Sequence, residues 1–298
     1  MKEIVVISGK GGTGKTSITA SIAALPGSKT VLADCDVDAA DLHLVTAPAV
    51  RCTTPFTGGH KAHIDPASCN GCGKCIPVCR FDAVHLERSS EGHPGVPVID
   101  RFACEGCGVC VRICSAEAIR FPQEVCGEWY ISDTRFGTMV HARLDAGAEN
   151  SGKLVTLLRR EARRLAEEEE ARRILVDGSP GIGCPVIASM TGADVALVVT
   201  EPTVSGVHDL QRIISLAGKL AVTPVVCVNK WDLNADGTDS IQTFCRERGI
   251  RFAGRIRYDA LATAAQYRQL AVVETAKDGS AADIAAVWNC IATEVRMP

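Results

Sequence analysis

The sequence predicts an α/β protein in which a doubly wound, mostly parallel sheet is interrupted by a small inserted α+β domain. Three observations predict this fold. Short apolar runs rich in β-branched residues alternate with helical patterns over most of the chain. The alternation stops after about Val50 and resumes after Pro122. Between those points the chain is rich in Gly, Pro and Cys and repeats itself. We therefore expect a host domain in two parts, residues 1–57 and 123–298, around an insert at residues 58–122.

Five apolar runs are expected to form the host sheet, because parallel strands buried on both faces are almost wholly apolar. The resulting strand–helix alternation places a ligand at the carboxyl ends of the strands. In residues 159–173 opposite charges recur four positions apart, as in Arg163–Glu167 and Arg164–Glu168, which predicts a solvated helix face. The insert contains only short strand patterns, at residues 84–87 and 96–99, and no long helix. Host strands are expected at residues 4–7, 30–33, 174–176, 195–200 and 224–228, and helices at 15–24, 207–219, 238–248 and roughly 281–294.

The composition is typical of a soluble globular protein. A chain of 298 residues with 46% hydrophobic content can bury a large core and a small second one. A net charge of −3 gives no overall case for a nucleic-acid or anionic-membrane partner. The first apolar run is too short for a signal peptide, and no run approaches the length of a bilayer span. Of 15 cysteines, eight fall in two tight groups, which favours metal ligation in a reducing cytoplasm over disulfides.

The stretch "GKGGTGKT", residues 9–16, matches GxxxxGK[ST] between an expected strand and an expected helix, which is the context that the motif requires. Its glycines let backbone N–H groups curl around phosphate, and the helix N-terminus adds the positive end of its dipole. Lys15 is expected at the β- and γ-phosphates, and the Thr16 hydroxyl at Mg²⁺. The expected nucleotide-binding residues of this loop are Gly9, Lys10, Gly11, Gly12, Thr13, Gly14, Lys15, Thr16 and Ser17.

Acidic residues crowd the end of the second expected strand, in "ADCDVDAADLHL". Asp34 and Asp36 lie where carboxylates can position a water molecule or hold Mg²⁺. Asp38 and Asp41 are expected to be helix caps or surface residues. Farther along the chain, residues 229–232 read "NKWD", the NKxD pattern with which GTPases recognise guanine.

Two cysteine groups repeat the pattern C-x₂-C-x₂-C-x₃-C at an offset of 35 residues. This spacing resembles that of a bacterial two-cluster ferredoxin, in which three thiolates bind one cluster and the fourth binds the other. Structural zinc is the alternative, but zinc sites prefer two well-separated C-x₂-C pairs. The proline that usually follows the fourth cysteine is replaced by Arg80 and Ser115. We expect one [4Fe–4S] cluster on Cys69, Cys72, Cys75 and Cys114, and a second on Cys104, Cys107, Cys110 and Cys79.

Lys10, directly after the first glycine, resembles the deviant Walker A motif of the MinD/Mrp/ParA ATPases, which include the nitrogenase iron protein. The resemblance continues through "MVHARLDAGAENSGKLV", "DGSPGIGCPVIAS" and "TEPTVSGVHDLQRI" and covers nearly the whole chain. It implies that Lys10 reaches across a nucleotide-sandwich homodimer to the partner's phosphates. It also implies that Asp36 is the catalytic aspartate of switch I, and that Asp177 acts on Mg²⁺ through water in the switch II element.

The resemblance also bears on the base. In this group an Asn at the corresponding strand end contacts adenine, so we favour ATP over GTP, with Asn229, Lys230 and Asp232 at the base. The segment "GRIRYD" resembles a base-pocket loop that usually reads "IPYD", and Arg257 replaces its proline.

Cys184 lies near where the nitrogenase iron protein and Mrp-like carriers place cluster ligands at a dimer interface. A packed structural thiol is favoured there over a further metal or cluster site. Cys126 follows the insert and is given no firm role. The remaining cysteines, Cys35, Cys52, Cys227, Cys245 and Cys290, are expected to be core or incidental residues.

Three functions are open. The favoured one is a Mg²⁺-dependent ATP hydrolase whose ATP-driven dimer closure gates electron transfer through two [4Fe–4S] clusters to a redox or cofactor-biosynthesis protein. The second is an ATP-dependent iron–sulfur or metal-cofactor carrier of the Mrp type. The third is a ParA- or MinD-like positioning ATPase with redox-sensing clusters. A solvated surface is favoured over nucleic-acid contact for the arginines of residues 245–259.

Overall fold

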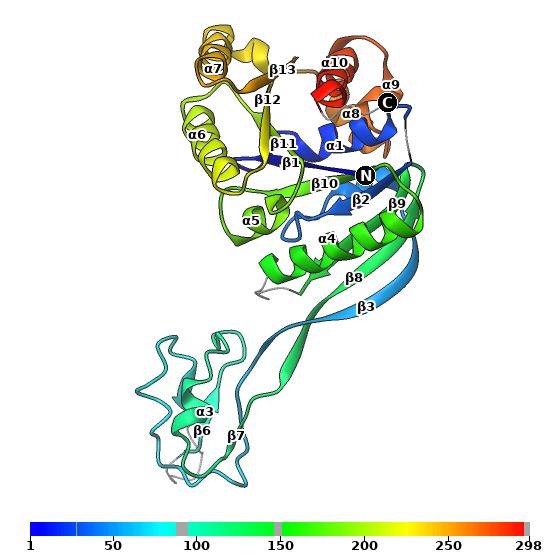
Figure 1. The fold of residues 1–298 in the computed structure, drawn as a ribbon. Coiled ribbons are helices and arrows are strands. Elements are labelled where there is room, and N and C mark those ends of the chain that lie inside the picture. Colours follow the sequence, from blue (N-terminus) through cyan, green and yellow to red (C-terminus); the bar gives the residue numbers. More distant parts are fainter. Residues whose placement is uncertain (28, 88–94, 146–150, 295–298) are drawn as a thin grey trace. The chain divides into compact units, whose positions relative to one another are not determined.

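The structure is a computed structural model that describes residues 1–27, 29–87, 95–145 and 151–294. The chain divides into two compact units (Figure 1). We call the first the host unit; it consists of Met1–Thr54, Glu128–Leu144 and Ser151–Pro298. We call the second the cysteine module; it consists of Pro55–Gly127 and Asp145–Asn150. Among the described residues, none of the helices is both long enough and apolar enough to cross a membrane.

In the described residues one sheet of nine strands runs in the order β13-β12-β11-β1-β10-β2-β9-β8-β3. Neighbours from β13 to β9 pair in parallel, which confirms the predicted mostly parallel α/β sheet. The central strands β1 and β10 are almost wholly buried, which explains their continuous apolar sequences. The strands are β1 (Lys2–Ser8), β2 (Thr30–Asp34), β3 (Ala49–His60), β8 (Gln123–Thr134), β9 (Gly137–Leu144), β10 (Arg173–Pro180), β11 (Val195–Thr200), β12 (Thr223–Asn229) and β13 (Arg251–Ile256).

Helices cover both faces of the sheet (Figure 1). On one face α1 (Lys15–Ala24) and α10 (Gly279–Glu294) share a core with Ile4 and Val6 of β1. Val5 and Ile7 point to the opposite face and are also fully buried. The other helices are α2 (Leu42–Thr46), α4 (Ser151–Glu168), α5 (Cys184–Met190), α6 (Val204–Lys219), α7 (Ala235–Glu247), α8 (Leu261–Tyr267) and α9 (Val272–Thr275), with a 3₁₀ turn at Trp231–Leu233.

The predicted solvated face of residues 159–173 is wrong at Arg173, which is 2% exposed, and at Arg159, which is 4% exposed. Its Nε donates to Glu3 Oε1 over 2.6 Å, and its Nη1 donates to the carbonyls of Ala188 and Thr191 over 2.7 Å each. The arginine therefore joins α4 to β1 and satisfies carbonyls at the end of α5. Only the exposed Arg164–Glu168 pair forms as predicted, at 2.6 Å.

Four strands of the large sheet, β3, β8, β9 and β13, have no counterpart among the sequence predictions. Most residues of β3 are exposed, and the strand contains Pro55, Gly58 and Gly59. It ends the sheet, and an edge strand tolerates proline because one of its sides has no ladder partner. Only Arg135 and Phe136 separate β8 from β9, so these two strands form a hairpin.

The cysteine module is small and rich in turns. It pairs β4 (His63–Ile64) with β7 (Ile119–Arg120), and β5 (Val84–Leu86) with β6 (Pro97–Ile99), both antiparallel. Its one helix in the described residues is α3 (Val109–Ile113). Glycines between the cysteines adopt positive φ at equivalent places of the two repeats, at Gly71, Gly73, Gly106 and Gly108. The sequence repeat is thus also a repeat of backbone conformation.

Candidate functional site

The Gly-rich loop connects β1 to α1 at the carboxyl edge of the sheet. Gly14 has a φ of 88°, and a Cβ built on it would lie 2.6 Å from Nδ2 of Asn229. A Cβ on Gly9 would lie 2.1 Å from Cβ of Asp209 in α6. Both positions therefore require glycine, so the loop packs closely against the ends of neighbouring elements.

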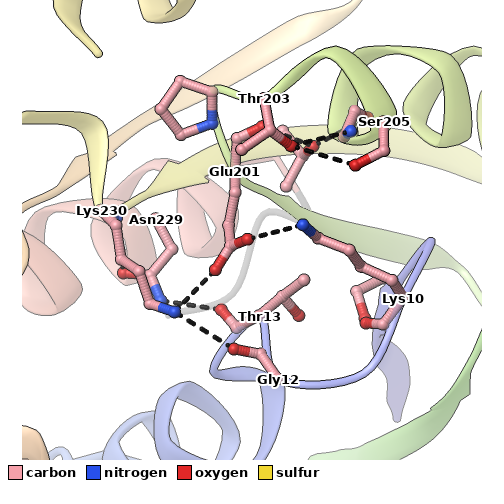
Figure 2. A network of polar contacts seen from close by, with 12 residues as sticks. Lys10, Gly12, Thr13, Glu201, Thr203, Ser205, Asn229 and Lys230 are labelled. Atoms are coloured by element: carbon pink, nitrogen blue, oxygen red, sulfur yellow. Dashed lines mark hydrogen bonds and ion pairs between the residues drawn. The ribbon is translucent and has the colours of Figure 1, made fainter. Parts of the chain in front are cut away.

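The end of β12 holds this loop in place. Asn229 Nδ2 donates to the carbonyl of Thr13 over 2.7 Å, and Lys230 Nζ donates to the carbonyl of Gly12 over 3.3 Å (Figure 2). Asp232 bonds to the segment after β13 instead: its Oδ1 accepts the backbone N–H of Tyr258 over 2.7 Å. The first two residues of "NKWD" thus support the loop, and one carboxylate oxygen of Asp232 is used by the segment after β13.

Buried carboxylates lie beside the start of α1. Lys15 Nζ is 3.4 Å from Oδ2 of Asp36, and both side chains are buried. The hydroxyl of Thr16 donates to Oδ2 of Asp177 over 2.6 Å, and that of Thr19 donates to Oδ1 over 3.1 Å. The fold therefore brings Lys15, Thr16, Asp36 and Asp177 together from three places in the sequence, whereas Asp38 and Asp41 are exposed.

The pKa values of the carboxylates in this cluster are raised above all by burial, with a smaller contribution from the negative charge of their neighbours. Burial raises the pKa of Asp177 to about 6; Asp36 adds to the rise, and Lys15 and Thr16 oppose it. Burial also raises the pKa of Asp34 well above its usual range, and the charges of Asp177 and Asp36 raise it further. The pKa of Asp36 is raised by burial, against the opposing effect of Lys15. A divalent cation would relieve this repulsion.

The residues present fit Mg²⁺ and a nucleotide. Carboxylate and hydroxyl oxygens are the donors that Mg²⁺ prefers. The hydroxyl of Thr13 in the loop is buried, and it has no hydrogen-bond partner among the described residues. Such an orphaned donor inside a Gly-rich loop suits a polar ligand.

A cavity of about 240 Å³ opens beside the loop. Gln266 of α8 lines it and donates from Nε2 to the hydroxyl of Ser17 over 3.1 Å. Arg257, which stands where the resembling loop has proline, also lines the cavity. Its guanidinium binds both carboxylate oxygens of Asp283 in α10, at 2.7 and 2.9 Å. This bidentate pair fixes the segment by a side-chain contact instead of a proline ring.

Lys10 does not extend into solvent. Its Nζ is 2.9 Å from Oε2 of Glu201, whose other oxygen, Oε1, is 2.6 Å from Nζ of Lys230 (Figure 2). Glu201 follows β11 directly and was assigned no role from the sequence. A single acidic residue between an apolar strand and a proline is the only local signal of it.

In the cysteine module, thiols from different repeats lie near one another. The pKa of Cys75 is raised by burial and also by the thiols of Cys69, Cys72 and Cys114. Cys114 belongs to the second repeat, so it lies with the first three cysteines. The pKa of Cys110 is likewise raised by burial and by Cys104 and Cys107. A small cavity of the module is lined by Cys79, Cys104, Cys107 and Cys110.

No group of three or more His, Cys, Asp or Glu side chains in the described part of the chain is arranged to hold a metal ion. The ligands of such a group would converge on a single ion. A [4Fe–4S] cluster spreads its four thiolates over four irons, so the proximity of thiols within each set bears more directly on it. The donor chemistry fits such clusters, and the two ligand sets stay a prediction.

The other cysteines differ in exposure. Cys184, expected to be packed, is exposed at the start of α5, so that expectation is wrong. Cys35, Cys227 and Cys245 are buried, as expected of core residues. The thiol of Cys126 accepts the N–H of Gly58 over 3.0 Å. Of the resembling segment at residues 139–155, residues 146–150 lie outside the described part.

Comparison with known proteins gives consistent matches. The CobQ/CobB/MinD/ParA nucleotide binding domain matches residues 4–272. An uncharacterized protein of Methanocaldococcus jannaschii is 34% identical over 234 residues, which cover 78% of this chain and 79% of that protein. A second uncharacterized protein of the same organism is 27% identical over 241 residues, with coverages of 78% and 82%.

Solved structures share the fold. The cell division ATPase MinD of Pyrococcus furiosus has a TM-score of 0.56 at 14% identity, covering 98% of this chain and 99% of that one. MinD of Pyrococcus horikoshii, solved with Mg-ADP, has a TM-score of 0.59 at 15% identity, with coverages of 99% and 97%. The McdA(D38A)–ATP complex of Cyanothece has a TM-score of 0.57 at 15% identity, with coverages of 100% and 97%. At such identities the likeness concerns the fold alone.

Proposed function

Because the chain belongs to the CobQ/CobB/MinD/ParA family of nucleotide-binding domains, we propose that it is a Mg²⁺-dependent ATPase that acts as a nucleotide-driven homodimer. Among the three functions expected from the sequence, family membership supports the MinD- or ParA-like ATPase most directly. It does not bear on electron transfer, which was the favoured expectation.

The observation that carries the proposal is the meeting of Lys15, Thr16, Asp36 and Asp177 at one edge of the sheet. Bound there, Mg²⁺ would neutralise phosphate charge, with Thr16 and Asp177 as the residues that hold it. Lys15 would bind the β- and γ-phosphates. Asp36 would orient the water whose oxygen forms a bond to the γ-phosphorus as the bond to the ADP oxygen breaks. Lys10 would supply positive charge to the partner's phosphates.

The geometry of "NKWD" supports adenine over guanine. A guanine reader needs a carboxylate that accepts two N–H groups from the base, as the NKxD aspartate does in GTPases. Here Oδ1 of Asp232 is already bonded to the backbone of Tyr258. Asp232 is therefore poorly placed to accept two hydrogen bonds from guanine. Asn229 and Lys230 bind the Gly-rich loop, and these contacts do not depend on the base.

The test is nucleotide binding by calorimetry in Mg²⁺. We expect wild-type protein to bind ATP and ADP, GTP to compete poorly, and Lys15→Met to bind at least about tenfold more weakly. Sedimentation with a slowly hydrolysed ATP analogue should show a dimer. The proposal fails if the folded wild-type protein binds neither ATP nor ADP.

A second candidate concerns the cysteine module. The grouping of Cys114 with Cys69, Cys72 and Cys75 supports two [4Fe–4S] clusters with crossed ligands. Bound clusters would let the protein pass single electrons to a partner, gated by the nucleotide state. Anaerobic purification should give about eight irons per chain. Two zinc ions per chain, or no metal, would overturn it.

Electron gating and cluster delivery can be separated. If the protein gates electrons, the ATPase rate should differ between reduced and oxidised clusters, and the iron should stay bound during turnover. If it is a carrier, iron and sulfide should move to an apo acceptor protein, and Cys184→Ala should slow that transfer. If the ATPase rate is the same with reduced and oxidised clusters, and no iron or sulfide is transferred, the clusters have only a structural role.

A further inference from the structure

Glu201 occupies a rigid position between β11 and α6. Pro202 follows it, and Thr203 caps α6 by accepting the N–H of Gly206 on its hydroxyl over 3.0 Å. The side chain of Glu201 is only 12% exposed and faces the Gly-rich loop (Figure 2). A strand end, a proline and a capped helix thus fix the point from which the carboxylate reaches the loop.

The carboxylate divides its two oxygens between two lysines. Oε2 pairs with Lys10 at 2.9 Å, and Oε1 pairs with Lys230 at 2.6 Å. Lys230 also donates to the carbonyl of Gly12. Burial raises the pKa of Glu201, but the bonds from Lys230 and Lys10 outweigh it and hold the pKa below its usual value, so the group is charged at neutral pH.

We propose that Glu201 is a positioning residue that holds Lys10 on its own chain and thereby sets the nucleotide concentration at which the homodimer closes. This rests on the proposed function, in which Lys10 binds phosphates across the dimer. Lys10 cannot do both, because its ammonium would have to leave Oε2 of Glu201 to reach another subunit.

The double pairing makes the release of Lys10 easy. A buried carboxylate that loses its only partner is strongly destabilising. Here Glu201 keeps Lys230, so no charge is stranded when Lys10 leaves. The side chain of Lys10 is 36% exposed, so water replaces part of the lost contact. The pair therefore opposes closure without preventing it.

The expected size follows from the exposure of the pair. A partly exposed ion pair shifts an equilibrium by about threefold. Two subunits each release one Lys10 when a symmetric dimer forms, so the overall constant for dimer formation changes by roughly tenfold. Each subunit also binds one nucleotide, so removing the charge of Glu201 should lower the nucleotide concentration needed for closure by about threefold.

The test is the concentration of a slowly hydrolysed ATP analogue that gives half-maximal dimer in mass photometry. We expect Glu201→Gln to lower it about threefold. In a Lys10→Ala background, Glu201→Gln should have no further effect, because Glu201 acts through Lys10. The matched control is Glu274→Gln, another partly buried paired carboxylate, in α9. It should leave the concentration unchanged. Thermal unfolding checks that each variant is folded.

A second measurement does not need the dimer. Without nucleotide, acylation of Lys10 by an amine reagent, followed by mass spectrometry, should be faster in Glu201→Gln than in wild type or Glu274→Gln. The inference alone is overturned if wild type dimerises but Glu201→Gln leaves both readouts within twofold of it, or if the shift persists in Lys10→Ala. If wild type binds no nucleotide or forms no dimer, the proposed function fails and this inference falls with it.

Discussion

Thr16 and Asp177 are joined by a hydrogen bond of 2.6 Å, from the hydroxyl at the start of α1 to a carboxylate in β10. The two residues lie far apart in the sequence, yet the parallel sheet brings their elements together at its carboxyl edge. The bond holds a fully buried carboxylate whose negative charge is poorly compensated. The buried charge therefore lowers the free energy of unfolding when the site is empty, but it is the charge that a metal–nucleotide complex needs.

Asp177→Asn should stabilise the protein without nucleotide. Burial raises the pKa of Asp177 from its ordinary value to about 6, so the folded state binds the proton more tightly than the unfolded state. Its stabilising contribution is present below the unfolded pKa and is lost as pH rises towards about 6. At pH 7 the variant should gain on the order of 1–3 kcal/mol of unfolding free energy.

The measurement is thermal unfolding of metal-free protein between pH 4.5 and 7.5. The difference in Tm between Asp177→Asn and wild type should grow with pH and level off above pH 7. Nucleotide binding in Mg²⁺ should weaken in the same variant. A pH-independent difference would mean that Asp177 is not the group that titrates.

Asp36→Asn should separate binding from hydrolysis. The amide keeps the size of the side chain but cannot accept a proton from water, so we expect ATP hydrolysis to fall about 10²-fold or more. Nucleotide binding should change little, because Lys15 and the Gly-rich loop remain. Single-turnover hydrolysis and calorimetry measure the two effects. Asp38→Asn is the control, since Asp38 is exposed on the same loop. Equal losses in both variants would argue against a catalytic role for Asp36.

Gly14→Ala should destabilise the loop even without ligand. Gly14 has a φ of 88°, which costs an alanine about 1–2 kcal/mol, and the new Cβ would approach Nδ2 of Asn229 to 2.6 Å. Gly11 is the matched control, because a Cβ there meets nothing within 4 Å. Urea unfolding of nucleotide-free protein should show a loss for Gly14→Ala and almost none for Gly11→Ala. Similar losses would mean that packing against Asn229 does not constrain the loop.

The two cysteine repeats give a test of crossed ligation. If Cys114 binds the cluster of the first repeat, Cys72→Ser and Cys114→Ser damage the same cluster. The double variant should then keep the other cluster, with about four irons and one set of electron paramagnetic resonance signals. If Cys114 bound within its own repeat, the double variant would lose both clusters. Cys52 lies outside both ligand sets, so Cys52→Ser is the control for iron lost during purification.

The sequence predicted the central strands because they are buried on both faces. β11 begins and ends where its apolar run does, and α1 spans the predicted residues. The edge strand β3 was not predicted because it is mostly exposed and contains Pro55. β9 was not predicted for another reason. His141 looks like a surface residue, but it is buried and bonded to Ser132 over 2.8 Å, so the strand lacks an apolar signature.

The same reasoning explains what was found at the site. Lys15 and Thr16 belong to a local motif that can be recognised from its spacing. Asp36 lies just after β2, and Asp177 lies in β10 directly after an apolar run. Glu201 and Arg159 carry no such signal, because each acts through partners far away in the sequence. Long-range ion pairs leave no periodic pattern, and arginines in a charged run look solvated until a fold is known.

Arg159→Met should be strongly destabilising. The guanidinium of Arg159 is buried, pairs with Glu3 and satisfies the carbonyls of Ala188 and Thr191. Removing it takes one of two arginines from the Glu3 carboxylate, which keeps Arg163, and leaves two carbonyls without this donor, which should cost about 2–4 kcal/mol. Arg164→Met, on the exposed face of the same helix, should cost within about 0.5 kcal/mol.

The effect of losing the Arg159–Glu3 ion pair can be separated from a simple loss of packing. Glu3→Gln removes the charge that Arg159 and Arg163 share, so the double variant with Arg159→Met should lose less than the sum of the two single variants, each of which is destabilising. Denaturant unfolding of all three variants measures the coupling. Because Arg159 joins α4 to the end of α5, and α5 follows the segment expected to be switch II, the single variant should also weaken nucleotide-driven dimer formation. If the losses simply add, Arg159 and Glu3 are not coupled.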